Sequence, residues 1–322
     1  MNQIEMVSLE QMVLANHRYR RFMKVWDFNK VDSLLRQAKS NNSHEGYGLE
    51  RIFRCLLLQF LEDLSDRELE VFLQENSAGK WFCGFLLSED TPDHTVFTRA
   101  RKKIGTALLS ELFANLRDQL RVQGFMNEVF TFVDASHLIA KASLWEERDE
   151  ALKQKYEKLN NVVLPKVAHD KQARIGCKGQ NKYWYGYKKH ISMDMQSGMI
   201  NKVAITPANV TDAQGLKHIC PSQGAIYADK GYCTSPARQA AARKGCHLAA
   251  IKKNNMKDKN TDQDRWYSKI RAPYERVFAS NSKRVRYKGI AKNQFAAFMQ
   301  AICFNLKRLL VISAPSPIAY GG

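Results

Sequence analysis

Residues 129–134 read Val-Phe-Thr-Phe-Val-Asp, and residues 224–229 read Gly-Ala-Ile-Tyr-Ala-Asp. Each stretch is a short apolar run that closes on an acid, which is typical of a buried strand. The two runs therefore predict two strands, the first ending at Asp134 and the second at Asp229. The segments around them predict the rest of the sheet.

Three further strands and two helices are predicted between and after these runs. The polar turn at 195–198 predicts that the strands flanking it form a hairpin. One of the helices has proline in its first turn and glycine after its end, which are helix start and stop signals. The predicted strands are Tyr183–Asp194, Met199–Ile205 and His247–Ile251, and the predicted helices are Asp212–Ile219 and Ser235–Lys244.

The order of these elements predicts an α/β fold with a ribonuclease-H-like sheet of five strands, mixed in direction and flanked by helices. In such a sheet the ends of the first and fourth strands lie side by side. We therefore expect Asp134 and Asp229 to meet. A helix predicted over Gln263–Ser280 would cross the same edge and bring Glu275 to them.

The N-terminal part predicts helices only. Residues 49–76 carry apolar side chains at helical spacing, and Ser65 with Glu68 forms a capping box that starts a new helix. A basic helix over 96–104 and another over 107–122 follow. Short helices of this kind fit a helix-turn-helix-like DNA reader, and a plain helical bundle with a solvated basic face fits equally well.

Three regions are therefore expected. Residues 1–124 form an all-helical, DNA-binding domain, and residues 125–313 form the catalytic domain, which contains a charged helical insert near 143–161. The last helix, Ile290–Ile312, carries an apolar stripe that should pack on the sheet. Residues 314–322 form a flexible tail.

The amino-acid composition limits the class of binding partner. Of 322 residues, 44% are apolar and 25% charged, as in a globular protein, and the net charge is +18. Such a surface favours nucleic acid, although anionic membranes or solubility alone could account for it. No apolar run approaches the roughly 20 residues of a membrane span, and the scattered cysteines indicate a reducing compartment. We expect a cytoplasmic protein without a membrane partner.

Asp134, Asp229 and Glu275 are the candidate metal ligands. Three carboxylates can hold two Mg²⁺ or Mn²⁺ ions, which is the arrangement that two-metal phosphoryl chemistry requires. Taken singly, each acid has an ordinary alternative: a strand terminator or helix cap, a turn residue, and an exposed helical acid paired with Arg271. Asp212 is the rival carboxylate, and it fits better as the first residue of a helix beside the cap.

Basic and aromatic residues are interleaved between positions 238 and 292, where sixteen Lys or Arg accompany only four Asp or Glu. Lysine and arginine bind phosphates, and exposed rings stack on unpaired bases. The residues predicted to contact DNA, here and in the basic helix and hairpin, are Arg99, Arg101, Lys102, Lys188, Lys189, Lys230, Trp266, Tyr267, Arg271, Lys283 and Arg286.

Several segments together resemble bacterial DDE transposases, and most closely the insertion-sequence-five group within the insertion-sequence-four type. The likeness runs from about residue 45 to 310 and is specific as a set. The segments that carry it are Leu64–Leu69, Thr91–Arg99, Asp134-Ala135, Tyr185–His190, Thr206–Asn209 with Asp212, Ala228–Tyr232 and the block from Arg271 through Glu275 to Gly289.

The resemblance implies an enzyme that cuts transposon ends and joins their 3′-hydroxyls to target DNA. Asp134, Asp229 and Glu275 would be its catalytic triad, with two Mg²⁺ or Mn²⁺ ions. Its partner would be double-stranded DNA, bound by a homodimer in the bacterial cytoplasm at the nucleoid. Of the family's tyrosine–arginine–glutamate–lysine signature, Arg271 and Glu275 keep the usual spacing, and Tyr267 and Lys283 are each one residue off it. A nuclease without strand transfer and a non-enzymatic DNA-binding regulator remain as alternatives.

Overall fold

The computed structural model describes residues 7–37, 46–141, 144–156, 158–179, 181–278 and 282–313. The expected tail at 314–322 lies outside these residues. The chain divides into two compact units. The first comprises Met1–Gln119 with Met299–Gly322, and the second comprises Leu120–Phe298.

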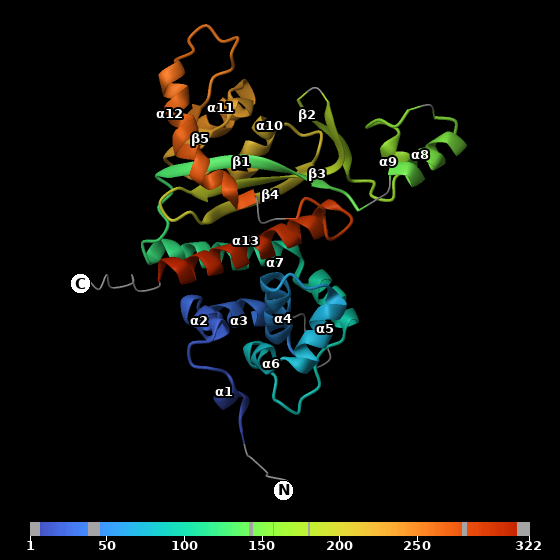
Figure 1. Cartoon of the computed structure of the whole chain (residues 1–322), viewed down its shortest axis with the longest axis vertical. Coiled ribbons are helices and arrows are strands. Elements are labelled where there is room, and N and C mark those ends of the chain that lie inside the picture. The colour runs from blue at the N-terminus through green and yellow to red at the C-terminus, as the bar shows by residue number, and fades with distance from the viewer. Residues whose placement is uncertain are drawn as a thin grey trace, which may run out of the picture. The chain divides into compact units, whose positions relative to one another are not determined.

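The first unit is helical, as the sequence predicts (Figure 1). Its centre is α4, most of whose side chains are buried, and the end of the chain's last helix packs on α4. There, Lys307 donates to the Leu61 carbonyl at 2.9 Å. The helices are α1 (Leu9–Met12), α2 (Arg18–Val25), α3 (Phe28–Gln37), α4 (Leu49–Leu61), α5 (Asp66–Glu75), α6 (Ser77–Cys83), α7 (His94–Val122) and the second half of α13 (Ile290–Ile312).

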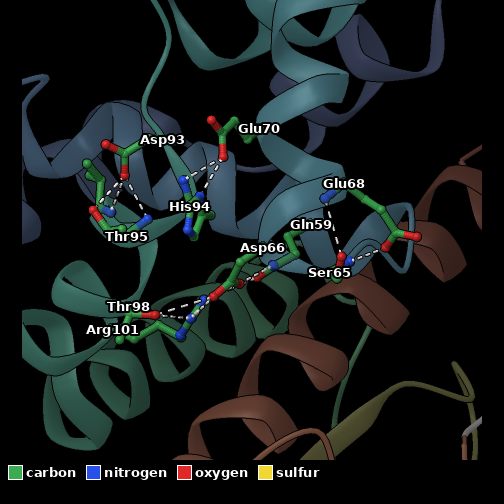
Figure 2. Close-up of polar contacts among 11 residues, drawn as sticks. Gln59, Ser65, Asp66, Glu68, Glu70, Asp93, His94, Thr95, Thr98 and Arg101 are labelled. Carbon is green, nitrogen blue, oxygen red and sulfur yellow. Dashed lines mark hydrogen bonds and ion pairs between the residues drawn. The ribbon is translucent and has the colours of Figure 1, made fainter.

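Helix α7 has two parts, because Gly105 interrupts it with φ 64° and ψ −177°. Only glycine adopts this backbone conformation without strain. The two helices predicted on either side of residue 105 are therefore confirmed, although no loop separates them. The first part is fixed to the start of α5 by Arg101, which donates to both carboxylate oxygens of Asp66 (Figure 2).

The predicted capping box at the start of α5 is confirmed. The Ser65 hydroxyl accepts from the Glu68 N–H at 3.3 Å, and the Glu68 carboxylate accepts from the Ser65 N–H at 2.7 Å (Figure 2). Ser65→Ala is expected to lower the free energy of unfolding by about 1 kcal/mol. Urea unfolding measures this, with Ser65→Thr as the control that keeps the hydroxyl. Equal stability of Ser65→Ala and wild type would contradict a capping role.

The second unit contains a mixed sheet (Figure 1). Its five main strands run in the order β4-β3-β1-β5-β6, with β3 antiparallel to both β1 and β4, and β5 parallel to β1 and β6. This confirms the predicted ribonuclease-H-like arrangement. The strands are β1 (Phe130–Ile139), β2 (Arg174–Lys178), β3 (Lys182–Asp194), β4 (Ile200–Pro207), β5 (Ala225–Ala228) and β6 (His247–Ala250).

Helices cover both faces of this sheet, since successive strand residues point to opposite faces. Ile226 and Ala228 of β5 join the core formed with α10 (Asp212–Ile219), η1 (Lys230–Tyr232) and α11 (Ser235–Ala242). Tyr227, between them, packs instead with Tyr267 of α12 (Thr261–Arg271). The charged insert near 143–161 contains α8 (Leu144–Lys153), and α9 (Leu164–Val167) follows it.

Gly215 allows α10 to lie close to β3. A Cβ at this position would stand 2.2 Å from the ring of His190, which is fully buried and hydrogen-bonded through Nε2 to the Thr206 hydroxyl at 2.8 Å. Gly215→Ala is therefore expected to destabilise the fold by about 1–3 kcal/mol. Lys217→Ala, at an exposed position of the same helix, should change the stability by less than about 0.5 kcal/mol. Similar urea midpoints for the two variants would show that the ring moves freely.

Four sequence predictions need correction. β2 was not predicted; it pairs with the first part of β3. β1 does not end at Asp134 but continues to Ile139, because β3 goes on pairing with it after β5 has ended. The helix predicted to reach Ser280 ends at Arg271, where η2 (Ala272–Phe278), a 3₁₀ helix, begins. Pro273 lacks the N–H that an α-helix would need there.

The packing of α13 also differs from the prediction. Its first half packs on the sheet, where the Gln294 side chain accepts from the Ile205 N–H at 2.8 Å and donates to the Val203 carbonyl at 3.2 Å. Its second half belongs to the helical unit and not, as predicted, to the sheet. By length and composition alone α13 could cross a membrane, but most of its apolar stretch is buried, as in many core helices.

Candidate active site

Asp134 lies in β1, and Asp229 directly follows β5, the neighbouring strand. The last pair of the parallel register is Phe132 with Tyr227, and continuing this register by two residues places Asp134 level with Asp229. Asp229 still has extended backbone angles, φ −74° and ψ 177°. Neighbouring strands lie about 4.8 Å apart, so the two carboxylates occupy one edge of the sheet.

The surroundings of Asp134 disfavour its ionised form. The pKa of Asp134 is raised to about 6, mainly by burial, with the negative charges of Asp229 and Asp212 acting in the same direction. The hydrogen bond from the Ala135 N–H and the positive charge of Arg271 lower the pKa of Asp134 but do not outweigh the burial. A raised carboxyl pKa beside a second carboxylate is characteristic of a functional site.

The hydrogen bonds of the two aspartates suit cation binding. Asp134 Oδ1 accepts from the Ala135 N–H at 2.8 Å, and Asp229 Oδ1 accepts from the Gly231 N–H at 2.9 Å. No described residue donates a hydrogen bond to either Oδ2. Free carboxylate oxygens are the ligands that Mg²⁺ and Mn²⁺ prefer, and a cation would offset the excess negative charge. The pair therefore fits a divalent ion.

Glu275 is not part of this pair. It lies on η2 with 56% of its side chain exposed, and its Oε1 is 3.8 Å from Arg271 Nη2. Within the described part of the chain, no three His, Cys, Asp or Glu residues are close enough together to hold a metal. The structure thus brings together two of the three candidate ligands.

Arg271 lies between Glu275 and the aspartates. It is 4% exposed, its guanidinium is 5.4 Å from the centre of the Phe132 ring, and its charge lowers the pKa of Asp134. Tyr274 packs against the same ring at 5.9 Å. Arg271, predicted to contact DNA, is therefore buried beside the carboxylates.

The hairpin lysines differ from each other, because neighbouring strand residues face opposite ways. Lys188 Nζ is 2.8 Å from Asp212 Oδ1, and 13% of its side chain is exposed. Lys189 is 2% exposed, and burial lowers the pKa of its ammonium group to about 8. In this conformation Lys188 is paired and Lys189 is out of reach of a phosphate, although both were predicted to bind DNA.

The other predicted DNA contacts fall into two groups. Those with exposed side chains are Arg99, Lys102, Lys230, Trp266 and Lys283, and Arg286 is half-buried. Arg101 is bonded to Asp66, and Tyr267 is 8% exposed in the core beside Tyr227.

Tyr232 is a site residue that the sequence analysis did not single out. It is fully buried, its hydroxyl has no hydrogen-bond partner among the described residues, and burial raises its pKa well above the usual range. The charges of Asp134, Asp212 and Asp229 contribute to the same shift. Its position three residues after Asp229 was the signal that could have revealed it.

A ribonuclease-H-like sheet with an aspartate pair at one edge defines the class of site, and comparison with known families gives the family. The family model for a Transposase DDE domain matches residues 128–306, and that for a Transposase domain (DUF772) matches residues 7–103. The chain belongs to the DDE transposase family and is a nucleic-acid-handling enzyme. DDE transposases generally use divalent metal ions. The insertion-sequence-five group is compatible with these matches but not specified by them.

Among solved structures, the chain is similar to a piggyBac transposase in a synaptic complex with hairpin DNA, determined by cryo-electron microscopy. The sequences are 8% identical, the TM-score is 0.38, and the likeness covers 92% of this chain and 76% of that one. A likeness this distant carries no inference about this chain.

Proposed function

We propose that the protein cleaves the ends of an insertion sequence by metal-dependent phosphodiester hydrolysis and joins the 3′-hydroxyl ends to target DNA. The observation that carries the proposal is the level placement of Asp134 and Asp229, with the raised pKa of Asp134. Membership of the DDE transposase family supports it.

In this proposal Asp134 and Asp229 hold Mg²⁺ or Mn²⁺, two ions per site. When bound, these ions supply Lewis-acid stabilisation of the charge that develops on the scissile phosphate, and they favour the deprotonated hydroxyl nucleophile. The protein's own contribution is to fix the ligands. The Ala135 and Gly231 N–H groups each hold one carboxylate oxygen, so the other oxygen keeps a set direction.

Glu275 is proposed as the third ligand. Because Arg271 is its neighbour at 3.8 Å, the proposal requires Glu275 to turn from Arg271 toward the aspartates when DNA and metal bind. The exposed side chain of Glu275 leaves it free to turn, and buried Arg271 would then face the phosphate charge. Exposed Lys230 and Lys283 and half-buried Arg286 are proposed to bind DNA phosphates, and Trp266 to stack on a base.

The proposed substrate is double-stranded DNA carrying the terminal repeats, together with target DNA. Two ends must be cut and joined together, so we propose that a homodimer acts on DNA, since two-fold symmetry supplies two equivalent sites. The net charge of +18 supports a polyanionic partner.

The test is an incubation of purified protein with a plasmid that carries the DNA flanking the coding sequence, with Mg²⁺, with Mn²⁺ or with EDTA. The product ends are mapped by sequencing. Metal-dependent breaks at inverted repeats together with joined products would support the proposal. Metal-dependent breaks without joined products would replace it with a nuclease.

A DNA-binding regulator without activity is the second candidate. One observation favours it: Glu275 does not lie with the aspartates. Binding of the flanking DNA without breaks under any metal condition would support the regulator and contradict the enzyme.

A further inference from the structure

The hairpin formed by β2 and β3 carries lysines that make no ion pair within the part of the chain that the structure describes. Lys178 and Lys182 are directly opposite each other in the strand pair, and both are exposed. Like charges in directly opposite positions destabilise a sheet. Neither lysine makes an ion pair with any residue that the structure describes. A bound external anion would offset the repulsion between these two lysines.

A third lysine reaches the same place from far along the chain. The segment after η2 joins the end of β1: the Ile139 N–H donates to the Lys283 carbonyl at 2.7 Å, and the Val285 N–H donates to the Ile139 carbonyl at 3.0 Å. This bridge holds exposed Lys283 beside the last residues of β1.

The three lysines converge on His137 of β1. Burial lowers the pKa of the His137 imidazole, and the positive charges of Lys283, Lys178 and Lys182 lower it further. The three ammonium groups are therefore near enough to act on one ring, and no described acid is among the groups that act on it.

Trp184 fixes the geometry of this face. Its ring is 5.6 Å from His137 and lies across Gly176, where a Cβ would stand 2.7 Å from it. Its Nε1–H donates to the Tyr187 carbonyl at 3.1 Å. Opposite residues in antiparallel strands share a face, so Trp184, Lys178 and Lys182 lie on the same face as His137.

This face leads to Asp212, whose charge acts on Asp134, although the Asp134 side chain itself points to the opposite face of β1, because it is an odd number of residues from His137. Lys188 is in register with His137, and its ammonium is 5.9 Å from the Trp184 ring and bonded to Asp212, whose charge raises the pKa of Asp134. His137 is also three residues beyond Asp134, which is about 10 Å along a strand. That distance corresponds to about three nucleotides of one DNA strand.

We propose that Lys178, Lys182 and Lys283, held around His137 and Trp184 and here called the hairpin patch, bind the phosphate backbone of duplex DNA next to the cleavage site. The inference rests on the proposed function, because it takes the substrate to be DNA cut at Asp134 and Asp229. Two DNA segments share this chemistry, the element end and the target, and the test separates them.

The first arm measures binding of a duplex oligonucleotide with the sequence of the element end, over a range of salt concentrations. Each lost phosphate contact lowers the slope of log affinity against log salt by about 0.9. Lys178→Gln with Lys182→Gln should lower the slope by about 2 and weaken binding at low salt. The control, Lys217→Gln with Lys244→Gln, removes one exposed lysine of α10 and one exposed lysine just after α11, and it should keep the wild-type slope.

The second arm measures joining by protein that already holds the element end, with added target plasmid at increasing salt. A lower slope of log affinity against log salt in the first arm assigns the hairpin patch to the element end. If only the salt dependence of joining changes, in the second arm, the hairpin patch is assigned to the target. Wild-type slopes in both arms overturn the proposal. The charge-keeping variant, Lys178→Arg with Lys182→Arg, should restore wild-type behaviour, and thermal melting shows whether each variant is folded.

These outcomes separate the two proposals. If wild type cuts and joins DNA while the Gln variant keeps its slope, only the hairpin patch is wrong. If wild type binds the DNA but never cuts it, the proposed function fails, and a slope change in the first arm still supports the hairpin patch. If wild type binds neither DNA, both are wrong.

Discussion

Asp229→Asn is expected to reduce cleavage of the element ends by at least about 10³-fold, while the affinity for the same DNA changes little. A metal ligand stabilises the transition state by several kcal/mol, and each 1.36 kcal/mol is a factor of ten in rate. Binding depends instead on phosphate contacts made by lysine and arginine. Asp134→Asn should have the same effect.

The matched control is Asp262→Asn, which removes a 90% exposed carboxylate of α12 in the same unit. It should cleave at the wild-type rate. Single-turnover cleavage and filter binding, measured on one oligonucleotide, separate the two effects. Wild-type cleavage by Asp229→Asn would show that the aspartate pair is not the catalytic centre.

The second large effect is a gain in stability. Asp134→Asn is expected to raise the free energy of unfolding of the metal-free protein by about 1–2 kcal/mol at pH 8. The folded pKa of Asp134, about 6, is above its ordinary value of 3.8, so its ionised form is disfavoured in the fold. Each pKa unit is worth about 1.36 kcal/mol, and partial exposure reduces the sum.

The direction of the pKa shift of Asp134 determines the pH range over which the stability changes. For wild type, the contribution of Asp134 is most favourable below about pH 4 and is lost as the pH rises through about 6. The difference between Asp134→Asn and wild type should therefore grow between pH 4 and pH 7. Urea unfolding in EDTA measures it, with Asp262→Asn as the control. Adding Mg²⁺ at pH 8 should stabilise wild type more than Asp134→Asn. A gap that does not depend on pH would contradict the raised pKa.

Local patterns predicted most of the second unit. The turn at 195–198 predicted the β3–β4 hairpin, and α10 starts at Asp212 as predicted. The bounds of α13 agree with the helix predicted from its apolar stripe. The ends of strands were harder to predict, because β1 continues beyond Asp134 through its pairing with β3 and not through its own composition. The sequence around Asp134 contains no sign of that pairing.

The candidate site was harder to predict than the fold. Strand alternation requires that only one of Lys188 and Lys189 can face outward, but which one depends on the register. The change from α-helix to 3₁₀ helix after Arg271 sets where Glu275 lies, and sequence spacing alone does not give its distance from the aspartates. Lys178 was missed because β2 is short and its sequence, Arg-Ile-Gly-Cys-Lys, is a weak strand signal. Lys182, its partner at the start of β3, lies one residue before the predicted strand.

The division of α13 between the units has a consequence for synthesis. α4 is covered in part by residues near the end of the chain, with Cys303 at the Leu57 carbonyl and Lys307 at the Leu61 carbonyl. A ribosome releases the first unit's other helices nearly two hundred residues before it releases this part. The N-terminal unit can therefore reach its final packing only after the second half of α13 has been made, and a message cut short before residue 299 yields a protein whose first unit lacks part of its core.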